Sequence, residues 1–203
     1  EDAFRRRFFR KLKGTGSMQE VERELIVRAG DGDMRAFREI YQRTSGYVYT
    51  LAYRVVGKKH DAEEVTQDVF LRIHRALNSF KFESSFKTWL YRVAVNTAIN
   101  HAKKRSRVTT HEVEEVFETP ATVTQPEAGK RLEAEDTERK LGGLLAQLNP
   151  DQRACILSRE IEGMDYQEIA ASLGININTV RSRLKRARET LIALGKTEVD
   201  HGM

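Results

Sequence analysis

The chain has 203 residues, and its 35 Lys and Arg residues outnumber its 30 Asp and Glu residues, which gives a formal net charge of +5. This length suits one large domain or two small ones, and the single cysteine, Cys155, excludes a disulfide framework within the chain. No apolar run approaches the roughly 20 residues that span a bilayer, so we expect a soluble, cytoplasmic protein without membrane insertion.

Charge is distributed unevenly along the sequence. Residues 18–108 hold 17 Lys and Arg residues against 11 Asp and Glu residues, whereas residues 109–135 hold 2 against 7. Cations are dense again over residues 181–188. Two modules that touch a polyanion, separated by a connector that avoids it, have this kind of distribution.

The first 17 residues, EDAFRRRFFRKLKGTGS, differ in composition from the rest of the chain, which starts at Met18. Dense Arg and Phe residues ahead of a Gly-Thr-Gly-Ser run indicate an expression remnant or a fused peptide joined to a native start at Met18. A native basic arm is the alternative interpretation.

Across residues 18–107, apolar residues recur at helical spacing and no stretch alternates in the manner of a strand. A first helix is predicted over residues 19–29, with Gly30 at its end. A second helix is predicted to be capped by Asp33 and stopped by Gly57. The buried face expected for this second helix consists of Phe37, Ile40, Tyr41, Val48, Leu51, Ala52 and Val55.

A third helix is expected to open at Asp61, with Glu64 three residues later as the second half of a capping pair. A polar loop over residues 78–85 then leads to a fourth helix that starts near Phe86. The buried stripes predicted for these two helices are Val65, Val69, Ile73 and Leu77 on the third, and Leu90, Val93, Ala94 and Ala98 on the fourth.

A polar and basic ribbon follows one face of the fourth helix, beside a group of aromatic residues. Aromatic faces next to a cationic track are typical of single-stranded nucleic-acid binding, because bases stack on the rings while the strand follows the charge. The alternative is that Phe86 and Trp89 belong to the core. The ribbon is Thr88, Arg92, Asn96, Asn100, Lys103 and Arg107, and the aromatic group is Phe80, Phe82, Phe86, Trp89 and Tyr91.

Residues 109–130 are predicted to form a flexible acidic linker, because prolines and like charges disfavour a packed core. A helix is expected over residues 131–148, weakened by the glycine pair at positions 142 and 143. The next helix is predicted to be capped by Asn149 and to run to Glu162. The buried Cys155 is expected to act as a small hydrophobe within it.

The stretch MDYQEIAASLGININTVRSRLKRAR, which starts at Met164, predicts two short helices around a tight turn. Asp165 and Glu168 form a capping pair, Gly174 ends the first helix, and Asn176 or Asn178 caps the second. The buried residues expected here are Ile169, Ala170 and Leu173 on the first helix, and Val180, Leu184, Ala187 and Leu191 on the second.

The second of these helices leaves a polar and basic face, on which five cations occur within eight residues with no acidic residue before Glu189. Such a helix fits the major groove of DNA, where side chains near its N-terminus meet base edges and later cations meet phosphates. A solvated basic helix is the alternative. The face is predicted to expose Asn178, Thr179, Arg181, Ser182, Arg183, Lys185, Arg186 and Arg188.

The predicted fold is therefore all-α, with two small helical domains at residues 18–108 and 131–195. The flexible acidic linker over 109–130 joins them, the second domain contains a helix-turn-helix, and a tail over 196–203 ends the chain.

The order of these parts resembles a bacterial RNA polymerase sigma factor of the sigma-70 family, extracytoplasmic-function (ECF) group. The segments that carry the resemblance cover nearly all of residues 25–195. They are GDMRAFREIYQRT, DAEEVTQDVFLRIHRALNSF, FKTWLYRVAVNTAINHAKKRSR, LNPDQRACILSREIEGMDYQEIAASLG and NTVRSRLKRARETL.

The resemblance implies that residues 18–108 are sigma region 2 and residues 131–195 are sigma region 4. It implies a polymerase-binding face at Asp61, Glu64, Gln67 and Asp68. It further implies that a melted minus-10 strand is read by Asn78, Phe80, Lys81, Phe82, Thr88, Arg92, Asn96, Asn100, Lys103 and Lys104. A duplex minus-35 element would be read by Asn178, Thr179, Arg181, Ser182, Lys185 and Arg186.

The expected function is promoter recognition, with core RNA polymerase and promoter DNA as partners and no chemistry of the chain's own. An anti-sigma factor that masks the polymerase-binding surfaces is a further partner implied by the resemblance. The sequence predicts neither a cofactor nor a metal, since no metal-ligand spacing joins Cys155 to the five histidines. The alternative is a stand-alone helix-turn-helix regulator that dimerises through its N-terminal half, and an enzyme is disfavoured because no nucleotide-binding glycine loop or nucleophile-base spacing is present.

Overall fold

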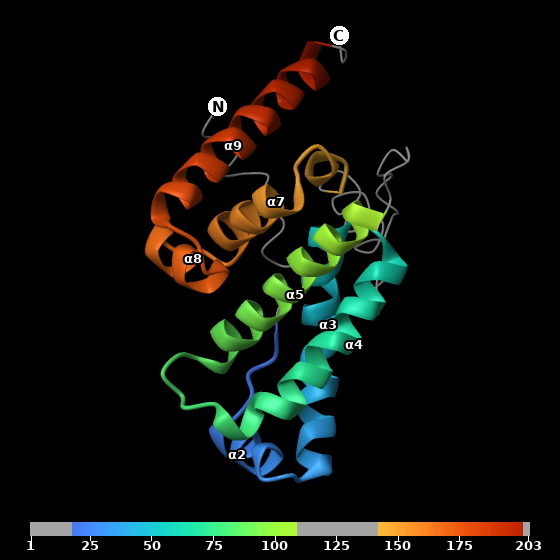
Figure 1. The fold of residues 1–203 in the computed structure, drawn as a ribbon, viewed down its shortest axis with the longest axis vertical. Coiled ribbons are helices and arrows are strands. Elements are labelled where there is room, and N and C mark those ends of the chain that lie inside the picture. Colours follow the sequence, from blue (N-terminus) through green and yellow to red (C-terminus); the bar gives the residue numbers. More distant parts are fainter. Residues whose placement is uncertain (1–17, 109–141, 201–203) are drawn as a thin grey trace. The chain divides into compact units, whose positions relative to one another are not determined.

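The structure is a computed structural model that describes the backbone of residues 18–108 and 142–200 and side chains as far as residue 194. The predicted N-terminal segment, the linker over 109–130 and residues 131–141 lie outside the described residues. Within the described ranges every regular element is a helix, so the all-α prediction is confirmed (Figure 1). In this part of the chain no helix has the length and apolar character needed to cross a membrane.

The chain divides into two compact units, the first of which ends at Val108. In this unit α3 packs against α2, α4 and α5, and α4 also packs against α5 (Figure 1). Residues without exposed surface on three helices, among them Ile40, Val69 and Leu90, form the core. The elements are α2 (Arg23–Gly30), α3 (Met34–Val56), α4 (Lys59–Ala76), the 3-10 turn η1 (Leu77–Ser79) and α5 (Phe86–Val108).

Helix α3 begins and ends where the sequence predicts. The Asp33 side chain accepts hydrogen bonds from the backbone amides of Arg35 and Ala36, which would otherwise lack partners at the start of a helix. Gly57 ends the helix in the left-handed conformation, with φ of 82°. The predicted buried face is wrong for Tyr41, which is 45% exposed and packs edge-on against Phe70, and only partly right for Phe37, which is half-buried.

Two predicted helix starts in this unit are wrong. Helix α2 begins at Arg23 because the preceding residue, Glu22, is extended, and this extended lead-in buries Val21. Helix α4 begins at Lys59, so Asp61 is not its cap and lies instead in the first turn. The carboxylate of Asp61 points inward to α5, a partner that the local sequence does not reveal.

The second unit contains α7 (Pro150–Ile156), the π-helical turn η2 (Leu157–Ile161), α8 (Tyr166–Leu173) and α9 (Ile177–Asp200). Both α7 and α8 pack against α9 (Figure 1). The predicted capping pairs are confirmed: the side chain at Asn149 accepts from the amide of Gln152, and Asp165 pairs in the same way with Glu168.

Three details of this unit differ from the predictions. The helix expected to continue from Asn149 to Glu162 changes to a π-helical turn after Ile156. The helix predicted to end at residue 148 ends at residue 146, and the glycine pair lies within its described part. Helix α9 continues to Asp200 and therefore includes part of the predicted tail.

Candidate nucleic-acid interface

Helices α8 and α9 form the helix-turn-helix. Gly174 adopts φ of 63° at the turn, and its amide donates back to the carbonyl of Ala170. Of the two candidate caps for α9 the structure selects Asn176, whose side-chain oxygen accepts from the amide of Asn178 at 2.8 Å. The stripe at Val180, Leu184 and Ala187 is fully buried, whereas Leu191 and Ala170 are half-buried. The opposite face of α9 is therefore held toward solvent.

The predicted exposure of all five cations on α9 is wrong for two of them. Arg183 pairs with Asp151 of α7 at 3.4 Å, and Arg188 pairs with Glu160 of η2 at 3.2 Å. Arg188 also donates to the hydroxyl of Tyr166 at 3.3 Å. Burial alone would lower the pKa of Arg188, but the hydrogen bonds to Tyr166 and Glu160 outweigh it and raise the pKa, which keeps the guanidinium charged.

The remaining cations and their polar neighbours are the residues assigned to the minus-35 element. Arg181 donates to the side-chain oxygen of Asn178 at 2.9 Å, so these two groups are presented together within the first two turns. Thr179 is half-buried, and its carbonyl accepts from the hydroxyl of Ser182 at 3.0 Å. The exposed members of the set are Asn178, Arg181, Ser182, Lys185 and Arg186.

In the first unit, the loop after η1 and the start of α5 form a compact aromatic cluster. The ring of Phe80 lies 4.7 Å from Phe82 and 5.0 Å from Trp89, and Phe86 lies 5.8 Å from Trp89, all between centroids. Phe86 is buried as predicted by the core interpretation, but Trp89 is only half-buried. Tyr91 is fully buried and is not a member of this cluster.

Phe82 is the one non-glycine residue in the described ranges with a positive φ, at 57°. Bulky residues rarely adopt this conformation, which costs on the order of 1–3 kcal/mol. The guanidinium of Arg23, from the first turn of α2, lies 4.3 Å from the centroid of the Phe82 ring. Sequence reasoning missed Arg23, because nothing in its local pattern connects it to a loop almost 60 residues away.

The polar ribbon predicted on α5 lies at the protein surface. The hydroxyl of Ser85 accepts from the amide of Thr88 at 3.0 Å and lies 2.8 Å from the Thr88 hydroxyl, as an N-cap does. Asn96 is half-buried and donates to the carbonyl of Arg92 at 2.8 Å. The exposed members of the predicted strand-reading set are Asn78, Lys81, Arg92, Asn100, Lys103 and Lys104.

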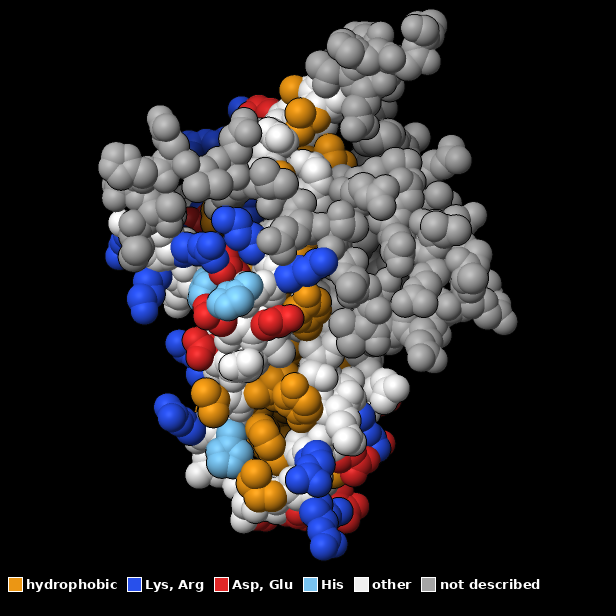
Figure 2. All heavy atoms as spheres, turned by 90° about the vertical axis from the view of Figure 1, so that its right-hand side faces the viewer, with side chains coloured by type: hydrophobic (Ala, Val, Ile, Leu, Met, Phe, Trp, Pro, Cys, Tyr) orange, Lys and Arg blue, Asp and Glu red, His pale blue; other side chains and the backbone are white. Residues whose placement is uncertain are grey.

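A second surface lies on α3 and α4. Figure 2 shows hydrophobic side chains gathered on one face of this unit, beside a group of acidic and histidine side chains. Tyr41 and Leu71 are among the exposed large hydrophobic residues of these two helices, at 45% and 57%. Of the four residues assigned to polymerase binding, Glu64, Gln67 and Asp68 are exposed on α4.

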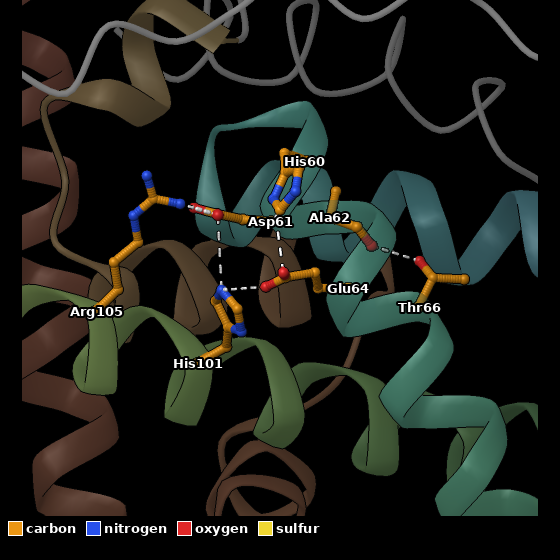
Figure 3. A network of polar contacts seen from close by, with 7 residues as sticks. All are labelled: His60, Asp61, Ala62, Glu64, Thr66, His101 and Arg105. Carbon is orange, nitrogen blue, oxygen red and sulfur yellow. Dashed lines mark hydrogen bonds and ion pairs between the residues drawn. The ribbon is translucent and has the colours of Figure 1, made fainter.

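The fourth, Asp61, belongs to a network between α4 and α5 (Figure 3). Its buried carboxylate accepts a hydrogen bond from Arg105, and His101 lies 3.7 Å from Asp61 and 3.8 Å from Glu64. Ligand atoms of His60, Asp61 and Glu64 also lie within 4.8 Å of one another. Arg105 compensates the charge of Asp61 and so links the first turn of α4 to α5.

The fold defines a modular DNA-binding protein with a helix-turn-helix in its second unit. Residues 40–108 match the family model of Sigma-70 region 2, and residues 138–191 match that of Sigma-70, region 4. The chain belongs to the sigma-70 family of RNA polymerase sigma factors, in its ECF group. It is thus a non-catalytic subunit that binds core RNA polymerase and directs it to promoters.

Relatives match over most of the chain. The RNA polymerase sigma-H factor of Pseudomonas aeruginosa is 36% identical over 179 residues, which cover 85% of this chain and 93% of the relative. The ECF RNA polymerase sigma-E factor of Escherichia coli K12 is 35% identical over 182 residues, covering 86% and 94%. Among solved structures, the sigma factor RpoE in complex with the anti-sigma factor NepR from Bartonella quintana has a TM-score of 0.61 at 25% identity, covering 80% of this chain and 98% of that one.

Membership of this family removes the stand-alone regulator as an explanation. That alternative assigned dimerisation to the N-terminal half, whereas residues 40–108 match the sigma region 2 model.

Proposed function

We propose that the protein reads its promoters at two elements in two different physical states. The minus-35 element is read as duplex by α9, and the minus-10 element is read as melted non-template strand by the loop after η1 and by α5. The observation that carries this proposal is the contrast between the two surfaces: one is a helix face with paired amide and guanidinium groups, and the other is an aromatic cluster beside cations.

At the duplex element, α9 enters the major groove with its N-terminal turns toward the bases. Arg181 and Asn178 offer hydrogen-bond donors and an acceptor to base edges, while Lys185 and Arg186 contact phosphates. Thr179 and Ser182 supply hydroxyl groups between these positions. Arg183 and Arg188 take no part in DNA binding, because they hold α9 against α7 and η2.

At the melted element, unpaired bases stack against the aromatic cluster and hydrogen-bond to the polar ribbon. Unstacking a base before its capture costs a few kcal/mol. Stacking of a base on an aromatic ring stabilises the complex by about 1–3 kcal/mol. Phe80 and Phe82 provide ring faces, and Thr88 and Asn96 provide polar groups for base edges. The cations assigned to phosphates of this strand are Lys81, Arg92, Lys103 and Lys104, and the amides assigned to it also include Asn78 and Asn100.

The exposed face of α4 binds the core polymerase. Glu64, Gln67 and Asp68 present acidic and amide groups there, and Asp61 supports the face by holding Arg105 and the first turn of α4 in place. The related sigma factor bound to an anti-sigma factor supports the further proposal that a partner of that class masks this protein in the cytoplasm. We assign residues 18–108 to region 2, residues 131–195 to region 4 and residues 109–130 to the linker.

The proposed recognition of one duplex element and one melted element is tested by measuring open-complex formation on two templates. One is the promoter as full duplex, and the other is the same promoter already unpaired at the minus-10 element. Asn96→Ala is expected to impair use of the duplex more than use of the unpaired template. Arg181→Ala, the matched variant in the other unit, is expected to lose roughly 1–3 kcal/mol on both templates. Equal defects of Asn96→Ala on the two templates would remove Asn96 from the strand-reading set.

A further inference from the structure

The conformation of Phe82 requires an explanation beyond the fold. No glycine occupies this place in the loop, although a glycine adopts a positive φ without strain. The ring is half-buried, and its centroid lies 4.7 Å from that of Phe80. Burial in the core therefore does not explain the positive φ. Strain of this kind persists only where surrounding groups hold it.

The group that faces the Phe82 ring comes from α2. Arg23 places its guanidinium 4.3 Å from the ring centroid, within the range of a cation–π contact. The neighbouring Glu22 accepts a hydrogen bond from Arg43 of α3 at 2.6 Å, which links the start of α2 to α3.

The other end of α2 lies against the base of the same loop. A Cβ added at Gly30 would stand 3.3 Å from the backbone Cα of Asn78 and 3.3 Å from the carbonyl oxygen of Leu77. Helix α2 therefore approaches η1 closely at its C-terminus and reaches Phe82 through Arg23 at its N-terminus. Helix α2 thus contacts both the base of this loop and its Phe82 ring.

We propose that Arg23 is a positioning residue for promoter opening, and that it keeps Phe82 in the left-handed conformation in which its ring receives an unstacked base. This inference rests on the proposed function of the loop. Arg23 acts through the ring and does not itself bind the strand. Without it, Phe82 relaxes to a negative φ, and the fraction of molecules with a binding-competent loop falls.

The expected size of the effect depends on that fraction, since the apparent Kd rises as the competent population falls. Loss of one exposed cation–π contact corresponds to about a two- to five-fold weaker affinity for the unpaired template. Arg23→Lys keeps a cation over the ring and is expected to recover part of the loss. Arg35→Ala removes the same charge from the neighbouring helix α3 and serves as the matched control, with no expected change.

The test is a double-mutant cycle on the holoenzyme, with affinity measured for a promoter fragment that is unpaired at the minus-10 element. Phe82→Gly removes the ring and also the strain, so this substitution suits the backbone. If Arg23 acts through Phe82, Arg23→Ala weakens binding in the wild-type background and has no further effect in the Phe82→Gly background. A 2-aminopurine base at the captured position should lose its stacking quench in both single variants.

Three outcomes overturn the proposal. Equal losses from Arg23→Ala in both backgrounds, with a log–log salt slope smaller by about 0.7, would make Arg23 a phosphate contact. Weaker binding by Phe82→Gly but not by Arg23→Ala would refute the positioning role of Arg23 and leave the proposed function of the loop unchanged. No loss for Phe82→Gly would contradict the proposed function of the loop as well. Core polymerase affinity and thermal unfolding, followed by circular dichroism, verify that each variant is folded.

Discussion

The division of the cations on α9 leads to a quantitative prediction about two arginines that are two positions apart. The side chain of Arg188 is 26% exposed and pairs with that of Glu160, which is 14% exposed, whereas Arg186 is exposed. The same substitution at these two places should therefore change two different quantities. Arg188→Ala should lower the free energy of unfolding, and Arg186→Ala should lower the salt dependence of promoter binding.

The magnitudes can be worked out from the contacts. A hydrogen bond to a charged group contributes about 1.5–3 kcal/mol when well buried, and the partial exposure of Arg188 reduces this to about 1–2 kcal/mol. Removing one phosphate contact from duplex DNA lowers the log–log salt slope by about 0.9. Arg188→Ala should leave that slope unchanged, and Arg186→Ala should leave the unfolding free energy within about 0.5 kcal/mol of the wild type.

The assays separate the two units of the chain. Trp89 is the only tryptophan in the sequence and lies in α5, so its fluorescence reports the first unit. Helicity measured by circular dichroism during urea unfolding reports both units, and the transition absent from the fluorescence belongs to the second. A reduced salt slope for Arg188→Ala together with unchanged unfolding would refute the assignment of Arg188 to the interior.

Three further predictions concern stability. Burial raises the pKa of the Cys155 thiol from 9.0 to about 11, despite the opposing effect of Arg183. Between these two values the unfolded chain binds fewer protons at this thiol than the folded chain does, so the unfolding free energy should fall as pH rises from about 9 to 11, and Cys155→Ala should reduce that slope. Arg105→Ala leaves the buried Asp61 carboxylate without its guanidinium, which should cost about 1–3 kcal/mol in Trp89-monitored unfolding; Asp61→Asn in the same background should recover part of it, and an additive loss would contradict the pairing. Asp165→Ala should destabilise the second unit by about 1 kcal/mol through loss of the α8 cap, with no shift in the Trp89-monitored transition.

Local signals in the sequence were sufficient to predict the helix ends that depend on neighbouring residues. Asp33, Asn149 and Asp165 cap helices because their side chains reach amides only two or three residues away. Gly57 and Gly174 end helices because they adopt positive φ without a Cβ penalty. Such features need no knowledge of the rest of the fold.

Features that depend on distant partners were not predictable in this way. Asp61 followed by Glu64 has the pattern of a capping pair, but Arg105 draws Asp61 inward from 44 residues away. Arg183 and Arg188 lie in a stretch whose composition is typical of a DNA-binding face. Their acidic partners, however, lie on α7 and η2. In each case a long-range ion pair overrides what the local pattern indicates.

The central claim is that one chain reads a duplex element and a melted element with separate residues. The most direct test is transcription of fragmented genomic DNA from the source organism by purified core polymerase, with and without this protein, and then mapping of transcript starts. New starts that share two spaced upstream motifs are expected, with Arg181→Ala relaxing only the upstream motif and Asn96→Ala affecting only the downstream one. The same starts with core polymerase alone, or one motif altered by both variants, would contradict the account.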